Sequence, residues 1–427
     1  MSLIKKSFLH LVVLSAMLMT AAAVNAQKTS PAPRQEKLLN GLKVLIWNLP
    51  SSETVTVKLR IHGGSAFDPQ GKEGVMKMLS EGFFPTKESR EFFEELGGGL
   101  EIDCNYDYIQ VTARARNDEF LTVLETLSQS ILGPEIGKDA TSGLRAAVLE
   151  QLKEVEGDPG YIADRAVARR LFGTFPYGRP ILGTRETLEA IDFADLRFAK
   201  DRLLTADNAT LSIEGKVDPA LAFRAARRYL GSWLKADKKI PSTFRQPDPP
   251  ARTVEVLEVP GAGANELRFA GRGVSRSESD YYAALTLEKI LAKRIQGTDG
   301  RTAFVRSEAH VLPGSLVFGV SGWQPSGGSG NGPSAADRWA ESIPANVLSG
   351  TVSASEFDAA HREVLSELSR YDTAELWLDA DTYKTGPAGK EYEKAAAVKP
   401  ADVQRVLARL QKEPLAFVRV RPSANDN

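Results

Sequence analysis

Two stretches of the chain follow one pattern: Val55-Thr-Val-Lys-Leu-Arg-Ile-His-Gly-Gly-Ser and Asn265-Glu-Leu-Arg-Phe-Ala-Gly-Arg-Gly-Val-Ser. In each, apolar residues alternate as in a β-strand, glycines end the run, and a helical pattern begins after a polar turn. The dipeptide Leu-Arg occupies the same place in both, at 59–60 and at 267–268, an offset of 208 residues. The pattern predicts two strand–turn–helix units of one kind.

Further matches occur where the two units would end. Ala-Asp-Leu at 194–196 corresponds to Ala-Asp-Val at 401–403, and the strand-like run at 209–213 corresponds to that at 416–420, both at an offset of 207. Because the offsets nearly agree, the sequence indicates a duplicated domain of about two hundred residues, which lies within the usual size of a domain.

The order of elements within each half predicts the fold class. Strands begin and end each half and helices lie between, which indicates an α+β fold in which a mainly antiparallel sheet carries helices on one face. We expect domains at 27–234 and 251–427, joined by a proline-rich linker at 235–250. The helical patterns fall at 74–84, 143–155, 162–172, 219–234, 281–295, 334–349, 354–370 and 400–411.

The first 26 residues have the pattern of a secretory signal peptide. A basic start at Lys5 and Lys6 precedes an apolar run, and the small residues before Gln27 suit a signal peptidase. The alternative is an uncleaved membrane anchor, although a span needs about 20 apolar residues. No other stretch is apolar enough to span a membrane, so we expect an exported, periplasmic protein with no membrane segment after cleavage.

Composition limits the chemistry. With 54 Lys and Arg against 55 Asp and Glu, the chain has no basic excess for nucleic-acid binding. Its single cysteine, Cys104, lies in a strand-like run, where a packing role is expected; a cross-chain disulfide or a nucleophile is the alternative. Of four histidines, His62, His310 and His361 follow the signal peptide and are scattered in sequence.

Several segments together resemble the insulinase and mitochondrial-processing-peptidase family of zinc proteases. They are Leu39-Asn-Gly-Leu-Lys-Val, Gly63-Gly-Ser-Ala-Phe-Asp-Pro, Gly74-Val-Met-Lys-Met-Leu-Ser-Glu-Gly-Phe-Phe, Phe175-Pro-Tyr-Gly and Asn208-Ala-Thr-Leu-Ser-Ile-Glu-Gly. The resemblance implies two duplicated domains that form half of a clam-shell chamber. It also implies that zinc and extended peptides are the family's ligands.

Active members of that family carry His-x-x-Glu-His on a helix and a later glutamate as third protein ligand. In this chain those positions are held by Lys77, Ser80, Glu81 and Gln151; a slip along the later helix would bring Glu150 or Glu154 to the last of them. A lysine ammonium has no lone pair for zinc and serine cannot act as the carboxylate base. We therefore expect no metal in this chain, with Lys77 and Glu81 as an ordinary i,i+4 pair on a solvated helix face.

The resemblance also implies a role for such a chain. Many members pair a zinc-binding subunit with a degenerate sister whose second domain presents an arginine and a tyrosine to substrate. Arg306 matches the arginine and His310 stands in place of the tyrosine, and the alternative for Arg306 is an ion pair with Glu308. The family's edge-strand mode of binding extended peptide would use the strand that begins at Gly99.

These features lead to three hypotheses. The first is an inactive subunit that pairs with a zinc-binding partner to form a peptide-degrading heterodimer, with zinc in the partner only. The second is a stand-alone peptide-binding or scaffold protein of the same fold. The third is a weakly active metallopeptidase with a shifted site.

Overall fold

The computed structural model describes residues 32–133, 136–236, 244–245, 247–260, 265–295, 302–323 and 335–423. The expected signal peptide lies outside the described residues, as does most of the expected linker. From Pro33 onwards the two halves belong to one compact unit. None of the helices in the described ranges is long and apolar enough to cross a membrane.

The first half is built on a six-stranded sheet, sheet 1, in the order β1-β2-β6-β3-β5-β4. Only the β2–β6 pair is parallel among these strands. The strands are β1 (Arg34–Lys37), β2 (Lys43–Asn48), β3 (Thr54–Ile61), β4 (Gly99–Cys104), β5 (Ile109–Arg116) and β6 (Ala209–Gly215). The helices are α2 (Val75–Glu81), α3 (Lys87–Glu95), α4 (Phe120–Leu132), α5 (Lys138–Val155), α6 (Pro159–Phe172), α7 (Arg185–Ala190), α8 (Phe193–Leu203) and α9 (Pro219–Leu230).

The second half is built on a five-stranded sheet, sheet 2, in the order β7-β11-β8-β10-β9. Its strands are β7 (Val254–Val259), β8 (Asn265–Arg272), β9 (Thr302–Glu308), β10 (Ser315–Trp323) and β11 (Ala416–Pro422). Its helices are α10 (Tyr281–Arg294), α11 (Ala335–Val347), α12 (Ala354–Arg370), α13 (Thr373–Tyr383), α14 (Glu391–Ala396) and α15 (Pro400–Lys412).

The duplication predicted from sequence is confirmed by the topology. Strands β2, β6, β3, β5 and β4 lie in the same order as β7, β11, β8, β10 and β9, and the parallel pair falls at the same place in both sheets. The fold is therefore α+β with two duplicated domains. Sheet 1 has one additional strand, β1, which pairs antiparallel with the outer edge of β2.

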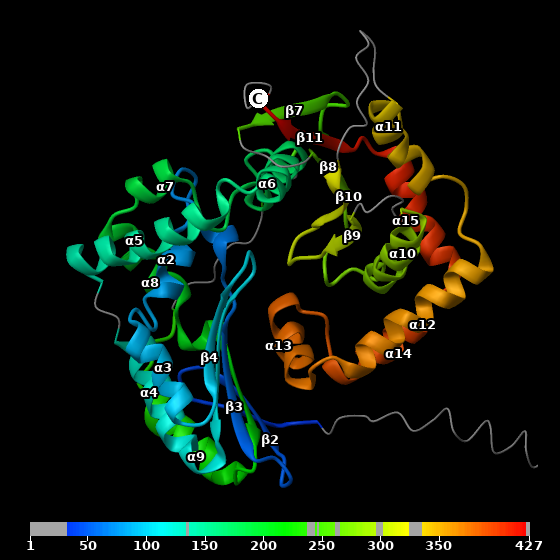
Figure 1. Cartoon of the computed structure of the whole chain (residues 1–427). Coiled ribbons are helices and arrows are strands. Elements are labelled where there is room, and N and C mark those ends of the chain that lie inside the picture. The colour runs from blue at the N-terminus through cyan, green and yellow to red at the C-terminus, as the bar shows by residue number, and fades with distance from the viewer. Residues whose placement is uncertain are drawn as a thin grey trace, which may run out of the picture. The chain divides into compact units, whose positions relative to one another are not determined.

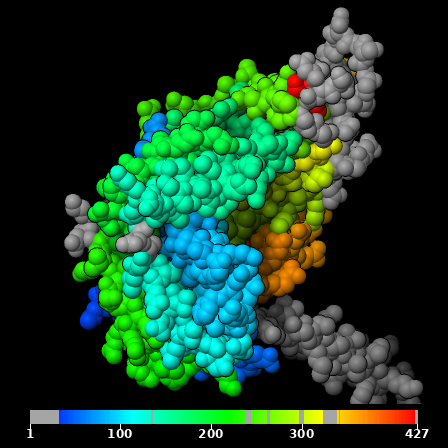
Figure 2. All heavy atoms as spheres, turned by 60° about the vertical axis from the view of Figure 1, so that its left-hand side comes forward, coloured from blue at the N-terminus to red at the C-terminus, as the bar shows by residue number. Residues whose placement is uncertain are grey.

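Alternation along the strands explains why helices cover one face of each sheet. In β3, Val55, Val57, Leu59 and Ile61 are fully buried in one apolar core with residues of α2, α4, α5, α8 and α9. Figure 2 shows the first half from this side, where its helices form the outer surface. Odd-numbered residues of β8 contribute in the same way to a second core, shared with α10, α11, α12 and α15.

The opposite face of each sheet is covered by a helix from the other half (Figure 1). Helix α6 of the first half packs its alanines and Val167, Leu171 and Phe172 on β8, β10 and β11 of sheet 2. Helix α13 of the second half lies on sheet 1, where Ala374 and Trp377 contact Leu45 and Trp47. We call α6 and α13 the exchanged helices, because each belongs to one half of the chain and covers a face of the other half's sheet.

The repeated Leu-Arg dipeptide lies at these two contacts. Arg60 is fully buried, ion-pairs with Glu375 of α13, and donates from Nη1 to Asp379 of α13 at 2.7 Å. Arg268 is 3% exposed and donates from Nε to Asp164 of α6 at 2.6 Å. Each arginine therefore joins its own sheet to the helix that arrives from the other half.

Candidate functional site: a degenerate metal-binding helix

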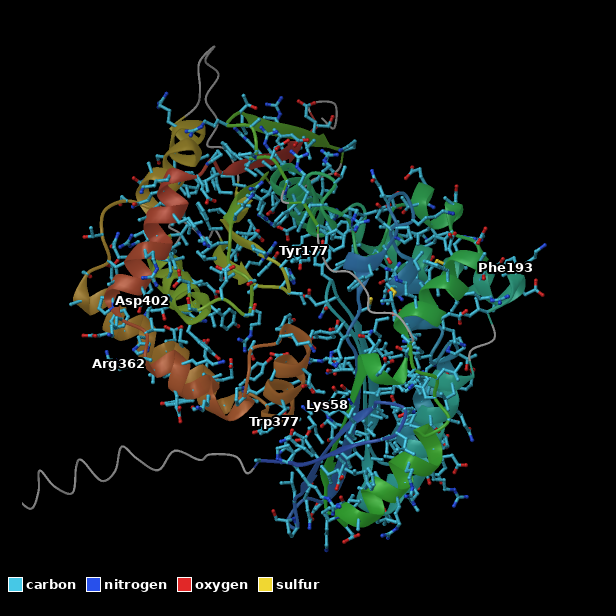
Figure 3. All side chains as sticks on the ribbon, turned by 180° about the vertical axis from the view of Figure 1, so that it is seen from behind. Lys58, Tyr177, Phe193, Arg362, Trp377 and Asp402 are labelled. Atoms are coloured by element: carbon cyan, nitrogen blue, oxygen red, sulfur yellow. The ribbon has the colours of Figure 1, made fainter. Side chains whose placement is uncertain are left out.

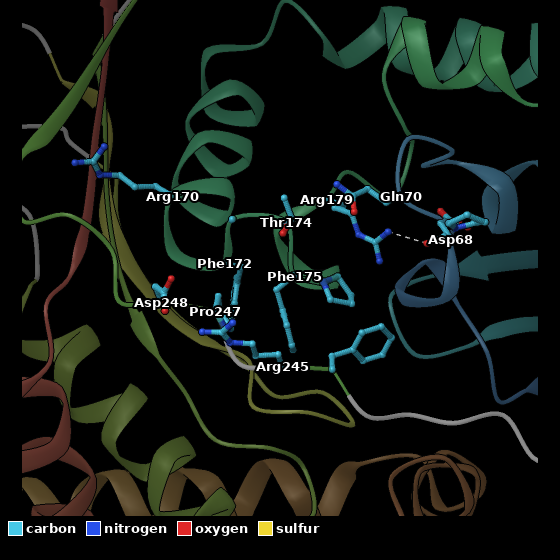
Figure 4. Close-up of a pocket in the computed structure, with 14 residues that line it drawn as sticks. Asp68, Gln70, Arg170, Phe172, Thr174, Phe175, Arg179, Arg245, Pro247 and Asp248 are labelled. Carbon is cyan, nitrogen blue, oxygen red and sulfur yellow. Dashed lines mark hydrogen bonds between the residues drawn. The ribbon is translucent and has the colours of Figure 1, made fainter.

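Helix α2 carries three of the four positions at which the family holds its zinc motif. It begins after Gly74, whose φ of 105° lies in the left-handed region that favours glycine. The Asp68 carboxylate accepts hydrogen bonds from the backbone N–H groups of Gly74 and Met76, each at 2.8 Å. Arg179 in turn donates from Nη1 to the Asp68 carbonyl oxygen at 2.7 Å (Figure 4). These contacts fix the start of α2 and hence the direction of its side chains.

Three of the four motif positions meet in space. Lys77 Nζ lies 2.7 Å from Glu81 Oε1, and Gln151 of α5 donates from Nε2 to the same oxygen at 2.9 Å. The other oxygen, Oε2, accepts from Arg90 Nη2 of α3 at 2.6 Å. Both oxygens of the carboxylate are therefore occupied by donors from three elements.

Ser80 takes no part in this cluster. Its side chain is fully buried, and its hydroxyl donates to the Lys77 carbonyl oxygen at 2.7 Å within the same helix. The position at which the family holds its catalytic base therefore carries a hydroxyl that already donates a hydrogen bond within α2. Glu150 forms an exposed pair with Lys153 instead of turning toward the cluster.

The expectation of a solvated helix face is wrong, although the i,i+4 pair itself is present. Glu81 is only 6% exposed, because α2 is packed between α5, α8 and β4. Burial alone would raise the pKa of Glu81, but hydrogen bonds from Gln151 and Lys77 outweigh it and lower the pKa below its usual value. The carboxylate is therefore held ionised by its neighbours.

These residues do not fit zinc. A zinc site needs three protein donors with free lone pairs around one point. Here the Lys77 ammonium offers none, Gln151 uses its amide N–H toward Glu81, and Glu81 has both oxygens engaged. The lysine ammonium lies next to the carboxylate and balances its negative charge without a metal ion.

The histidines that follow the signal peptide lie apart from this cluster and from one another. His62 lies just after β3, with its ring nitrogens 3.0 Å from the hydroxyls of Thr382 and Thr210. Burial, followed by the charge of Lys384, lowers the pKa of His62 to about 3. His361 Nε2 lies 2.8 Å from the Ala395 carbonyl oxygen. Each has protein partners of its own.

His310, which was expected to contact substrate, instead contacts residues of the first half. Its Nδ1 lies 2.7 Å from an oxygen of Asp107, which is buried in the turn between β4 and β5. Its ring lies against Tyr177, with ring centroids 4.4 Å apart. Tyr177, labelled in Figure 3, comes from the loop after α6. His310 therefore connects the β9–β10 turn to two segments of the first half.

Arg306 is engaged in the ion pair that the sequence left as the alternative. Its Nε donates to Glu308 Oε1 at 2.7 Å, and its Nη2 lies 3.1 Å from the Asp164 carboxylate that also binds Arg268. About 39% of its side chain remains exposed. The structure does not bring Arg306 and His310 onto a common partner.

Strand β4, which begins at Gly99 as expected, lies at the edge of sheet 1. Leu100, Ile102 and Cys104 point into the first core, where burial raises the pKa of the Cys104 thiol, so a packing role fits this cysteine. Glu101 and Asp103 point to the other side and line a polar cavity of about 240 Å³ together with residues of β3, β5 and α13. Strand β4 itself contacts α2.

Two segments of the chain match models of known protein families. Residues 43–185 match the family model described as insulinase (peptidase family M16), and residues 190–300 match the peptidase M16 inactive domain. The chain belongs to this family. The first match lies within the first half, and the second extends from the later part of the first half, across the expected linker, to just beyond α10 in the second half.

Individual relatives are distant. The chain is 23% identical to an uncharacterized zinc protease of Rickettsia bellii over 208 residues, which are 47% of this chain and 50% of the relative. It is 22% identical to the mitochondrial-processing peptidase subunit beta of Saccharomyces cerevisiae over 297 residues, 67% of this chain and 64% of that protein. The chain thus matches about half the length of the Rickettsia relative.

The fold is shared more completely than the sequence. The peptidase M16 inactive domain structure from Pseudomonas fluorescens superposes with a TM-score of 0.78 at 17% identity, covering 93% of this chain and 99% of that one. At this identity the likeness establishes the fold alone.

Proposed function

We propose that this chain is a catalytically inactive subunit that pairs with a zinc-binding member of its family to form a peptide-degrading chamber. The observation that carries the proposal is the closed cluster of Lys77, Glu81 and Gln151 at the positions of the metal ligands. With no free donor set and a serine at the place of the catalytic base, hydrolysis is left to the partner. Zinc is accordingly expected in that partner and not in this chain.

The edge of β4 supports a role in binding extended peptide. A peptide added there as a further strand would satisfy backbone groups at the sheet edge. Its side chains would alternate, and those on one side would enter the polar cavity beside Glu101 and Asp103. The cavity also contains Lys58 and Arg114, so it offers both charges to a polar substrate residue.

Arg306 and His310 are the proposed contacts from the second domain. Arg306 would hold a peptide carbonyl by charge-assisted hydrogen bonds from the exposed part of its guanidinium, beside its contacts with Glu308 and Asp164. His310 would keep Nδ1 on Asp107 and use Nε2 toward the substrate. Export to the periplasm rests on the first 26 residues of the sequence.

Co-purification tests this proposal. The full chain, tagged at its C-terminus, is isolated from the envelope of the cells that produce it, and bound chains are identified. We expect a family member with intact His-x-x-Glu-His, and cleavage of a quenched peptide only when both chains are present. Cleavage by this chain alone would favour the weakly active peptidase, whereas peptide binding without any such partner would favour the stand-alone scaffold.

A further inference from the structure

The two sheets differ at one edge. In sheet 1 the outer edge of β2 is paired with β1 through four residue pairs, from Arg34 with Ile46 to Lys37 with Lys43. Strand β7 occupies the corresponding place in sheet 2, and no strand in the described part of the chain pairs with its outer edge. An unpaired edge presents backbone donors and acceptors that can accept another strand.

One hydrogen bond identifies which residues of β7 direct their backbone N–H and C=O groups away from β11. The Ser423 N–H donates to the Val259 carbonyl, so odd-numbered residues of β7 direct their backbone groups toward β11. Val254, Val256 and Glu258 therefore direct theirs outward. The two valines are 42% and 43% exposed, and β7 pairs with β11 in an unbroken register. The strand also contains no proline or lysine, the residues that commonly block an edge.

A cavity adjoins this edge on the α6 side. It has a volume of about 810 Å³ and is lined by Leu257 of β7, by the α6 face that carries Ile162 and Ala166, and by the end of α5 and the start of α7. Leu257 belongs to the same side of β7 as Glu255, which pairs with Arg169 at 2.7 Å. A strand added to β7 would thus direct every second side chain over this cavity.

Arginine side chains are the positively charged groups of this cavity. Arg169 and Arg185 lie at its rim, 64% and 51% exposed, and pair there with Glu255 and Glu156. Arg165 donates to the main-chain carbonyls of Gly178 and Arg179 at 3.0 and 3.3 Å, and in the described ranges it forms no ion pair. Three glutamates also line the cavity, so the excess of positive charge is small and local to α6. The opposite side of β7 offers the two exposed valines instead.

We propose that the outer edge of β7 and this cavity bind an extended segment of a partner protein, in which apolar residues alternate with acidic ones. The segment adds antiparallel to β7, as β1 adds to β2. Its apolar side chains cover Val254 and Val256, and its carboxylates reach Arg165 and Arg169 across Ile162. This site is separate from the β4 edge and from the α2 cluster, so it does not depend on the function proposed above.

A labelled synthetic peptide tests the site on the full chain. The probe alternates valine and glutamate over seven residues, and binding is followed by fluorescence anisotropy. A second version, N-methylated at alternate amides, cannot pair with a strand edge. We expect saturable binding of the first peptide and about tenfold weaker binding of the second, because several edge hydrogen bonds are lost.

Variants locate the binding. Val256→Pro removes an outward N–H from an edge strand, a position where proline is tolerated, and should weaken binding about tenfold. Arg169→Glu should weaken it about fivefold, whereas Arg362→Glu, on the exposed side of α12, should not change it. Equal binding of the two peptides, or unchanged binding to both site variants, overturns the proposal. So does a homodimer that Val256→Pro dissociates in light scattering, since a second copy would then occupy the edge.

Discussion

Glu81 organises the degenerate site at the scale of single residues. It accepts from Lys77, Gln151 and Arg90 while almost completely buried. In such a place a carboxylate is tolerated only while its partners remain, because an unpaired buried charge is strongly destabilising. The stability of this region therefore depends on the same residues that occupy the positions of the family's metal ligands.

Glu81→Gln tests this dependence. The change leaves the Lys77 ammonium and the Arg90 guanidinium without their carboxylate, so we expect the free energy of unfolding in urea to fall by about 2 to 4 kcal/mol. The matched control is Glu91→Gln, which breaks the exposed i,i+4 pair with Lys87 and should cost less than about 0.5 kcal/mol. Equal effects of the two changes would show that the cluster is not held as described, and any peptidase activity lost in Glu81→Gln would point to a shifted site.

His310→Ala tests the connection between the halves. The change removes the partner 2.7 Å from the buried Asp107 carboxylate and should lower the free energy of unfolding by about 1 to 3 kcal/mol. A double-mutant cycle with Asp107→Asn measures the pair itself. Strictly additive effects in that cycle would contradict a direct interaction.

The sequence predicted part of this site. Alignment with the family's zinc motif placed Lys77, Glu81 and Gln151 at the positions of the metal ligands, and the structure brings these three side chains together. Arg90 was missed, because the chain turns between α2 and α3 and no spacing rule relates residues across that turn. The burial of Glu81 was missed as well, since a lysine and a glutamate four residues apart are typical of an exposed helix face.

At the scale of elements, the contact of α13 with sheet 1 is dominated by charge. Lys58 of β3 is 2% exposed and ion-pairs with Asp372, the N-cap residue of α13, and with Glu375 of that helix. Figure 3 shows Lys58 on the sheet and Trp377 on the helix at this contact. Because Arg60 pairs with the same helix, cations on the strand meet carboxylates on α13 over successive turns.

Glu214 of β6 makes this contact sensitive to pH. Burial, followed by the nearby Asp372 charge, raises the pKa of Glu214 from its usual 4.5 to about 7. Between these values the folded state binds more protons than the unfolded chain, so this group's contribution to stability falls as the pH rises through that window. Glu214→Gln should therefore gain stability relative to the native chain between pH 5 and pH 8, by on the order of 1 to 3 kcal/mol.

Denaturation at pH 5, 6, 7 and 8 measures this effect. The control is Glu53→Gln, an exposed position before β3, which should leave the pH dependence unchanged. If the curves of the native chain and Glu214→Gln run parallel, the raised pKa of Glu214 is wrong.

Helix α13 could not be found from sequence, whereas residues 354–370 were predicted with the bounds that α12 has. The amphipathic pattern of α12 is regular, whereas the face of α13 that contacts the sheet mixes carboxylates with the apolar Ala374 and Trp377. For the same reason Lys58 and Arg60 look like the solvated side of an alternating strand although both are buried.

At the scale of the whole molecule, the exchange of α6 and α13 makes the two halves interdependent. The repeat predicted from sequence is real, but its boundary in the chain does not separate two complete cores, because α6 lies before the linker and packs on sheet 2. Repeats reveal which segments correspond, and they do not reveal which copy a helix packs on.

Separate expression of residues 27–234 and 251–427 tests this interdependence. Each fragment alone would expose the apolar surface that an exchanged helix covers, so we expect aggregation or a broad thermal transition for each, and a soluble complex when both are co-expressed. Two fragments that each unfold cooperatively at the melting temperature of the full chain would contradict the exchange as a source of stability.

The central claim is that the cluster on α2 replaces a metal site. Elemental analysis of the purified full chain, with hydrolysis of a quenched peptide measured on the same sample, tests it most directly. The control carries Lys77→His, Ser80→Glu, Glu81→His and Gln151→Glu, which supply the donor set that zinc requires. We predict no stoichiometric zinc and no chelator-sensitive cleavage for the native chain, and zinc uptake by the control. One zinc per native chain together with cleavage that a chelator abolishes would contradict the account.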